Sequence, residues 1–220
     1  EKQPYGDWIK EKTTRLDQLN LIPPKIKLEH SLLTNQQIFG YSQEDLRILM
    51  GPMAETSKEP VGSMGNDTPL PVLSDRPQNL FSFFKQLFAQ VSNPPLDAIR
   101  EELVTQLFIP LGPRENLLDE SKDHCNILTV PNPILTNEEI GKIKMLNQKI
   151  LKTKTINTLF KISKGADGLR RSLARIKTET INAIKEGYSI IILSDRGVNQ
   201  ENTFIPSLLA VGTVHHFLIK

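Results

Sequence analysis

A cysteine beside a histidine is the first place to look for chemistry, because a thiolate next to an imidazole is a common catalytic nucleophile. The sequence has one cysteine, Cys125, and it follows His124 directly. Neighbouring residues in an irregular stretch seldom present their side chains to each other, and a free cysteine usually packs as a small apolar residue. We therefore assign no catalytic nucleophile to this pair.

Two adjacent histidines, His215 and His216, are the second candidate. Imidazoles suit zinc, but neighbours on a helix point about 100° apart and cannot easily hold one ion. The glycine-rich phosphate loops, the H-E-x-x-H zinc motif and the C-x-x-C redox motif do not occur in the sequence. We therefore assign no catalytic and no metal-binding residues.

Asp195 and Arg196 follow a continuous apolar run, YSIIILS at 188–194. Such a run is typical of a parallel strand buried on both faces, and ligands bind at the carboxyl ends of parallel strands. Two opposite charges in a turn more often form a structural ion pair. The alternative is a free-standing α/β enzyme that binds a small anionic substrate at Asp195 and Arg196.

A segment rich in glycine and proline, residues 51–74, has no helical period and is expected to be a long ordered loop. Hydroxyl and charged side chains on such a loop can line a polar passage or contact another domain. The opposing interpretation is a solvated surface loop. The candidates for a passage or a domain interface are Thr56, Lys58, Glu59, Ser63, Asn66, Asp67 and Thr68.

Short periodic segments surround this loop. Ser42 and Asp45 have the spacing of a capping box for a helix that reaches Met50 and ends at Gly51-Pro52. The strongest amphipathic pattern predicts a helix over 78–91, and Asp97 is expected to cap a short helix after it. Residues 105–135 look irregular. A second capping box, Thr136–Glu139, predicts a helix to about Asn147.

The last third of the chain alternates strand and helix. We predict a strand over 153–160, a helix over 168–186 capped by Asp167 and closed by Gly187, the strand 188–194, and a final helix after Pro206. The face of the first of these helices is expected to carry Leu169, Leu173, Ile176 and Ile184. This order is typical of a parallel βαβα unit with a right-handed crossover. The predicted fold class is α/β, with a loop-rich, helical N-terminal half.

Composition excludes several classes of protein. The chain has 220 residues, 38% of them hydrophobic, with 27 basic and 25 acidic side chains and a net charge of +2. This balance argues against nucleic acid as a partner, and no apolar run approaches the ~20 residues that span a bilayer. The sequence has no signal peptide at its start. Because it begins at Glu1 and ends inside a predicted helix at Lys220, we expect it to be a piece of a longer chain.

Three long blocks resemble the central domain of glutamate synthase. The blocks run from GPMAETSKEPVG to DAIREELV (51–104), from LGPRENLLD to EEIGKI (111–143) and from EGYSIIILSDRG to HHFLIK (186–220). FKQLFAQVSNPPLDAIREE and SIIILSDRG are the most specific strings. The family usually has three consecutive histidines where this chain has His215, His216 and Phe217, which weakens a metal site there.

The resemblance implies a non-catalytic central domain over residues 1–220, with a loop-rich entry segment over 1–76 and helices and the βαβα unit over 77–220. It implies a reduced version of a (β/α)8 barrel that joins a glutaminase domain to an FMN domain and helps wall an ammonia tunnel. The parent enzyme makes two L-glutamate from L-glutamine, 2-oxoglutarate and two electrons.

The resemblance also implies that the chemistry lies in the neighbouring domains. FMN and a 3Fe–4S cluster are expected in the parent enzyme and not on these residues, and Cys125 matches no catalytic position of the family. Ferredoxin is the expected electron donor, with the pyridine-nucleotide form as the alternative. The expected location is the plastid stroma or the bacterial cytoplasm. We expect residues 56–68, with the hydroxyl and amide groups of Ser63, Asn66 and Thr68, to form part of the tunnel wall or its hinge.

Overall fold

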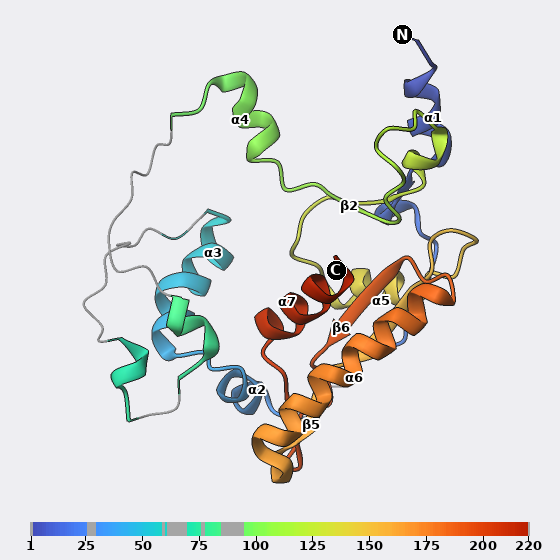
Figure 1. The fold of residues 1–220 in the computed structure, drawn as a ribbon. Helices are drawn as coiled ribbons and strands as arrows, with labels where there is room; N and C mark the ends of the chain where they lie inside the picture. Colours follow the sequence, from blue (N-terminus) through green and yellow to red (C-terminus); the bar gives the residue numbers. More distant parts are fainter. Residues whose placement is uncertain are drawn as a thin grey trace. The chain divides into compact units, whose positions relative to one another are not determined.

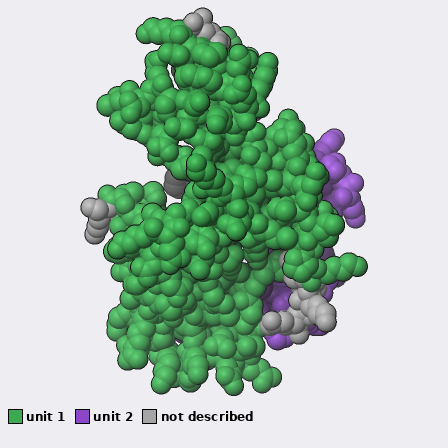
Figure 2. Space-filling view, turned by 90° about the vertical axis from the view of Figure 1, so that its right-hand side faces the viewer, with its two compact units in different colours: residues 1–26, 98–220 green, residues 27–97 purple. Residues whose placement is uncertain are grey.

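The computed structural model describes residues 2–25, 30–58, 60, 70–75, 78–84 and 95–219. These residues form two compact units, one of residues 1–26 with 98–220 and one of residues 27–97 (Figures 1 and 2). The fold is mixed α/β, as predicted. The described residues form three small sheets, and none of these closes into a barrel.

The βαβα unit predicted for the last third is present. Strands β4 (Thr153–Asn157) and β6 (Ile190–Ser194) pair in parallel, with Thr153 opposite Ile190. The long helix α6 (Gly165–Lys185) connects them, and α7 (Ser207–Leu218) follows after β6 (Figure 1). Pro206 lies at the N-cap of α7. The apolar run at 188–194 therefore does contain a parallel strand, which begins at Ile190 and has Ile190 buried and its other residues half-buried.

The predicted strand 153–160 is wrong in one respect, because the chain turns at Thr158. The N–H and hydroxyl of Thr158 both donate to the Ser194 carbonyl, at 2.8 and 3.0 Å. After this turn β5 (Leu159–Lys161) leaves β6 and pairs antiparallel with β7 (Asn202–Phe204). Strand β7 was not predicted, because its three residues, two polar and one aromatic, are too few to show the alternating pattern of a strand.

Two apolar clusters lie on opposite faces of the β4–β6 pair. Ile190 and Ile192 pack against the first cluster, with Ile143 of α5 (Asn137–Lys144). Ile191 and Leu193 pack against the second, which contains Ile176 of α6. Alternate residues of β6 are thus covered by helices on both sides, as the β-branched run requires. The remaining fully or nearly fully buried members are Leu16, Leu19, Leu128, Val130, Leu146, Leu151, Ile156, Ile205, Ala210 and Val214.

Two predictions about α6 are wrong. The helix begins at Gly165 with Lys164 at the N-cap, so Asp167 lies in the first turn, where it pairs with Arg170 at 2.9 Å. A carboxylate in the first turn is stabilised by the positive end of the helix dipole. Asp167 is therefore favourable there although it makes no capping hydrogen bond. Of the predicted apolar face, Leu169, Leu173 and Ile176 do pack in the second cluster. Ile184 is 46% exposed, because the buried stripe continues through Thr180 and Ala183. Gly187, with φ of 83°, closes the helix as predicted.

The start of the chain joins a second sheet in the larger unit. Helix α1 (Tyr5–Lys12) leads into β1 (Thr14–Arg15), which pairs in parallel with β3 (Leu128–Val130). Strand β2 (Ile109–Leu111) pairs antiparallel with the other side of β3, giving the order β1-β3-β2. The prediction that 105–135 is irregular is therefore wrong at β2 and β3 and at the 3₁₀ turn Lys122–Cys125, and confirmed for the rest of that range. Each strand is short, and Pro110 in β2 is tolerated because that strand has one partner.

The remaining helices of this unit are short. Helix α4 (Ala98–Val104) follows Asp97, as predicted. Single 3₁₀ turns occupy Leu16–Gln18, Lys122–Cys125 and Ile162–Lys164. Helix α5 ends at Lys144 and not near Asn147, which instead forms an isolated bridge with Lys152.

The smaller unit contains helical segments only, in its described part. Helix α2 (Leu32–Ile38) precedes a helix that Ser42 and Asp45 open with the predicted capping box. That helix does not end at Gly51-Pro52, because a π-helical turn (Asp45–Met50) continues directly into α3 (Gly51–Thr56). Pro52 therefore lies inside a continuous helical stretch, at the first positions of α3.

The amphipathic helix predicted over 78–91 begins differently. Its described part is a 3₁₀ helix at Leu80–Phe84, in which Phe81 and Phe84 are exposed, and residues 85–91 lie outside the described residues. Another 3₁₀ turn covers Pro71–Leu73. In the described ranges no helix combines the length and apolar character needed to cross a bilayer.

Candidate functional site

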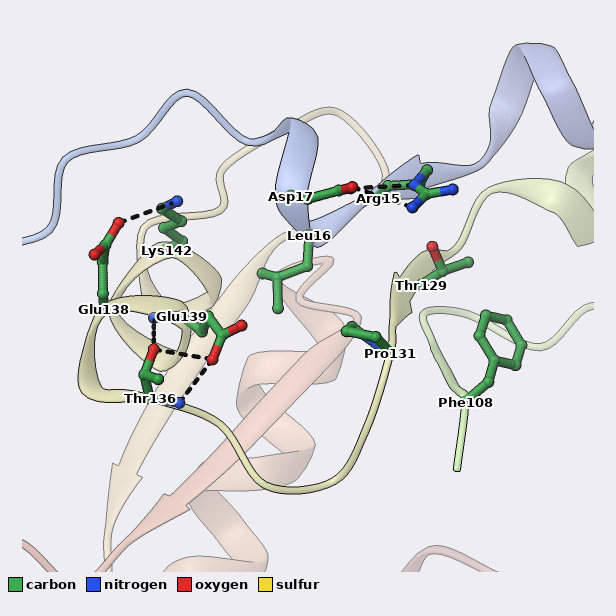
Figure 3. A pocket seen from close by; sticks show the side chains of 10 residues that line it. All are labelled: Arg15, Leu16, Asp17, Phe108, Thr129, Pro131, Thr136, Glu138, Glu139 and Lys142. Carbon is green, nitrogen blue, oxygen red and sulfur yellow. Dashed lines mark hydrogen bonds and ion pairs between the residues drawn. The ribbon is translucent and has the colours of Figure 1, made fainter. Parts of the chain in front are cut away.

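A cleft of about 580 Å³ lies in the larger unit, between the segment after β1, the strand β3 and the start of α5 (Figure 3). Its lining residues come from positions 15–17, from Phe108 and from positions 129–142, which are far apart in the sequence. Seven of its ten lining residues are polar or charged, and Leu16, Phe108 and Pro131 are apolar. The other lining residues are Arg15, Asp17, Thr129, Thr136, Glu138, Glu139 and Lys142.

The charged groups of the cleft are paired with one another. Arg15 donates from Nε and Nη2 to the two carboxylate oxygens of Asp17, both at 3.1 Å. Lys142 Nζ lies 3.2 Å from Glu138 Oε1, one helical turn away. The hydrogen bonds from Arg15 hold the pKa of Asp17 below its usual value. These pairs leave few free charges in the cleft for a ligand.

The Thr136–Glu139 capping box forms the wall at the start of α5. Thr136 donates from its backbone N–H and its hydroxyl to Glu139 Oε2, at 2.7 and 2.9 Å, and its hydroxyl oxygen accepts the Glu139 N–H at 3.2 Å. These bonds to Thr136 lower the pKa of Glu139. A carboxyl group with a lowered pKa is ionised at neutral pH and has no proton to give as a general acid. Neither Asp17 nor Glu139 is therefore a general acid in this cleft.

This cleft was not predicted from the sequence. Thr136 and Glu139 were recognised as a helix start, but their neighbours across the cleft come from β1 and β3. Thr129 Oγ1 donates to the Thr14 carbonyl at 3.3 Å across 115 positions of sequence. No local spacing could have revealed that pairing.

At the end of β6, Arg196 contacts α5 and not its neighbour. Its Nη2 donates to Asn137 Oδ1 at 2.8 Å, and in the described part of the chain Asp195 and Arg196 form no ion pair with each other. Burial, together with the nearby positive charge of Arg196, lowers the pKa of Lys144. The strand end thus brings Arg196, Asn137 and Lys144 near one another, a set that spacing alone did not indicate.

Only two of the seven loop candidates are described. Thr56 ends α3, where its hydroxyl donates to the Pro52 carbonyl at 2.8 Å and accepts the Lys58 N–H at 3.3 Å. Ser57 between them has φ of 55°, the left-handed conformation that often follows a helix. The first residues of the expected loop are therefore helical, which corrects that prediction. Glu59, Ser63, Asn66, Asp67 and Thr68 lie outside the described residues.

In the described residues, the histidine and cysteine candidates form no cluster that could bind a metal ion. His124 Nε2 lies 2.7 Å from the Asp119 carbonyl oxygen, and Cys125 is partly buried. The rings of His215 and His216 lie edge to face with centroids 5.4 Å apart on α7. Over the ranges that the structure describes, no group of three or more His, Cys, Asp or Glu residues could hold a metal ion.

The comparison with known families decides where this chain belongs. The model of the glutamate synthase central domain matches residues 34–220. The chain belongs to this family. The matched residues include the βαβα unit and the α5 side of the charged cleft, whereas Arg15, Leu16 and Asp17 of the cleft precede the matched range.

Curated relatives extend the match over nearly the whole chain. The large chain of NADPH glutamate synthase from Bacillus subtilis is 43% identical over 219 residues, which cover 99% of this chain and 14% of the relative. The chloroplastic ferredoxin-dependent glutamate synthase of Spinacia oleracea is 39% identical over 220 residues, 99% of this chain and 13% of the relative.

A third relative, the NADH glutamate synthase of Schizosaccharomyces pombe, is 44% identical over 184 residues, 83% of this chain and 9% of the relative. In each case the match covers only a small part of the relative. This glutamate synthase central domain spans about one seventh or less of the curated relatives that it matches.

Proposed function

We propose that this chain is the non-catalytic connecting domain of a glutamate synthase. The observation that carries the proposal is that the matching segment is shared by enzymes named for three different electron donors, NADPH, ferredoxin and NADH. A segment common to all three serves something that they have in common and not the choice of donor. The relatives give no support to the alternative of a free-standing α/β enzyme that uses Asp195 and Arg196.

The residues present do not fit the cofactors expected of the parent enzyme. Iron–sulfur clusters are held by several cysteine thiolates, and this sequence has one cysteine, Cys125. A flavin phosphate needs free cationic or N–H groups, whereas Arg15 and Lys142 in the cleft are already paired with carboxylates. FMN and the 3Fe–4S cluster therefore belong to a neighbouring domain in this proposal.

The proposed role is to join the glutaminase and FMN domains and to help wall the ammonia tunnel between them. The parent reaction yields two L-glutamate from L-glutamine, 2-oxoglutarate and two electrons. A tunnel wall must exclude bulk water, because ammonia that reaches water is protonated and lost. The segment from Thr56 to Thr68 is the proposed wall, since neutral hydroxyl and amide groups can hydrogen-bond ammonia without holding it as a cation would.

The experiment measures coupling in the full-length enzyme. The ratio of glutamine hydrolysed to glutamate formed is compared between the parent, Thr68→Trp and the control Thr178→Trp, an exposed threonine on α6. A tryptophan in the tunnel wall raises the ratio and releases ammonia into solution, while the control leaves the ratio unchanged. Unchanged coupling in Thr68→Trp, with the protein folded, would reject the tunnel role.

Ferredoxin is the proposed donor to the parent enzyme, and the plastid stroma or the bacterial cytoplasm is the proposed location. Ferredoxin-dependent relatives from spinach and rice each cover 99% of this chain at 39% identity, which supports this choice. The NADPH relative from Bacillus subtilis matches at 43%, so the donor needs its own assay. Turnover with reduced ferredoxin and none with NADPH is expected, and the reverse result would assign the pyridine-nucleotide type.

The barrel-like architecture is part of the same proposal. It is supported by the parallel strands β4 and β6, each of which is followed along the chain by a helix, α6 or α7, after one short strand, β5 or β7. An experimental structure of the full-length enzyme tests it. Strands added beside β4 or β6 from elsewhere in the chain would extend this sheet toward a barrel.

A further inference from the structure

Helix α7 has no Asp, Glu, Lys or Arg along its twelve positions, Ser207–Leu218. Its inner side belongs to the second apolar cluster, where Ala210 and Val214 are buried beside Ile205 and Ile176. In Figure 1 the helix, in dark red, lies beside α6 and β6. One face of α7 is therefore fully accounted for by packing within its own unit.

The opposite face of α7 is also mostly apolar, and the described residues of its unit leave it largely exposed. Leu208, Val211, His215 and Leu218 follow the spacing i, i+3, i+7 and i+10, which places them along one side of the helix. Leu208 is 44% exposed, Val211 56% and Leu218 45%. Gly212 lies on the same side, and a Cβ atom added there would meet no atom within 4 Å. We call Leu208, Val211, Gly212, His215 and Leu218 the outer stripe of α7.

The neighbouring helix α6 shows what a solvent face looks like in this protein. Its exposed side carries Arg170, Arg171 and Lys185. Surface helices usually pair one apolar face with one charged face, and helices that are apolar all round are usually buried. Because α6 and α7 belong to the same unit, the difference between them indicates that the outer stripe is not a solvent face.

We propose that the outer stripe of α7 is a docking surface for an uncharged, apolar surface of another domain of the same full-length polypeptide. This inference rests on the proposed role as a connecting domain. The matched relatives are about seven times longer than this chain, so such enzymes hold much additional polypeptide in cis. The stripe offers no carboxylate, ammonium or guanidinium group for an ion pair, and the small Gly212 lets an apolar side chain approach the helix backbone closely.

The first experiment measures access to the stripe in the full-length protein. Val211→Cys is compared with Ala174→Cys, an exposed position on α6, by the rate of alkylation with N-ethylmaleimide, read peptide by peptide with mass spectrometry. In the native protein we expect alkylation of the Val211→Cys variant to be at least about tenfold slower than that of the control, because reagent must wait for local opening. Both sites are expected to react equally in urea. Equal rates in the native protein would overturn the proposal.

The second experiment identifies what covers the stripe. A photo-crosslinking p-benzoyl-phenylalanine replaces Val211 in a mixture of ¹⁴N- and ¹⁵N-labelled full-length protein. Crosslinks to peptides outside residues 1–220, within chains of a single isotope, are expected. Mixed-isotope crosslinks assign the stripe to a second copy and overturn the proposal, as do crosslinks confined to residues 1–220. Neither readout uses enzyme activity, so a failed tunnel assay leaves both results interpretable.

Discussion

The guanidinium of Arg175 on α6 donates a hydrogen bond from Nη2 to the backbone carbonyl of Asn157 at 2.8 Å. The same Nη2 lies 3.2 Å from the Leu159 carbonyl, and Nη1 donates to Glu179 Oε1 at 2.9 Å. Asn157 is the last residue of β4, and Leu159 is the first residue of β5. The Arg175 side chain therefore bonds both sides of the connection between β4 and β5, where the chain passes from one sheet to the next. We call this connection, Asn157–Leu159, the joint.

Replacing Arg175 with alanine is expected to lower the free energy of unfolding by about 1–2 kcal/mol, because two carbonyls at the joint lose a charged donor. Arg175→Lys should recover only part of this loss, since an ammonium group lacks the planar fork that reaches two acceptors. Arg170→Ala is the control, because its pair with Asp167 is exposed and should be worth under about 0.5 kcal/mol. Urea denaturation followed by circular dichroism checks this, and equal losses at both positions would contradict it.

Removing the Thr136 hydroxyl is expected to cost about 1 kcal/mol, since the Glu139 N–H at the start of α5 loses its side-chain acceptor. Thr136→Ala should speed hydrogen exchange in α5 and leave α6 unchanged. Thr136→Ser keeps the hydroxyl and serves as the matched control. If the serine variant exchanges as fast as the alanine variant, the methyl group and not the capping bond is responsible.

The capping boxes and the buried strand could be predicted because they depend on residues close in sequence. Thr136 and Glu139, and likewise Ser42 and Asp45, bond across three positions. The helix after Ser42 was nevertheless ended too early, because Pro52 is a common stop signal, whereas here the helical backbone continues through it. Local spacing thus predicted where helices begin better than where they end.

What was missed depends on distant pairings. Strand β1 is two residues long and exists because Thr14 lies opposite Leu128 in β3. The cleft follows from that pairing, so neither the strands nor the cleft could be predicted without the fold. The contact between Arg196 and Asn137 spans 59 positions and replaces the local ion pair expected with Asp195.

The ionised form of Glu139 should make stability depend on pH. The hydrogen bonds from Thr136 lower the pKa of Glu139 in the folded state below its ordinary value. Its contribution is therefore fully present above the unfolded pKa and is lost as the pH falls through the folded pKa. Between about pH 6 and about pH 3, the parent protein should lose more stability than Glu139→Gln, which has no proton to bind there. Parallel pH profiles for the two proteins would contradict this assignment.

Ile176 and Ile184 lie on the same helix and test where its buried side runs. Ile176 is fully buried, and its replacement with alanine should cost about 2–5 kcal/mol, because a cavity forms in the second apolar cluster. Ile184 is 46% exposed, so the same substitution there should cost under about 1 kcal/mol. Thermal or urea unfolding of the two variants measures the difference. A larger loss of unfolding free energy at Ile184 than at Ile176 would show that the buried side of α6 includes Ile184, as the sequence predicted.

Gly141 is buried in the middle of α5, where an alanine would ordinarily be favoured over glycine by about 1 kcal/mol. Here a Cβ atom would lie 2.5 Å from Cβ of Pro23 and 3.0 Å from its Cγ. The proline ring cannot rotate away, so either the backbone near Pro23 moves or the helix does. We expect Gly141→Ala to lower the free energy of unfolding by about 1–3 kcal/mol and to speed hydrogen exchange in residues 16–25. Gly6→Ala on α1, where a Cβ meets no atom within 4 Å, is the control and should change stability by less than about 1 kcal/mol. A stabilised Gly141→Ala would show that the segment around Pro23 does not pack on α5.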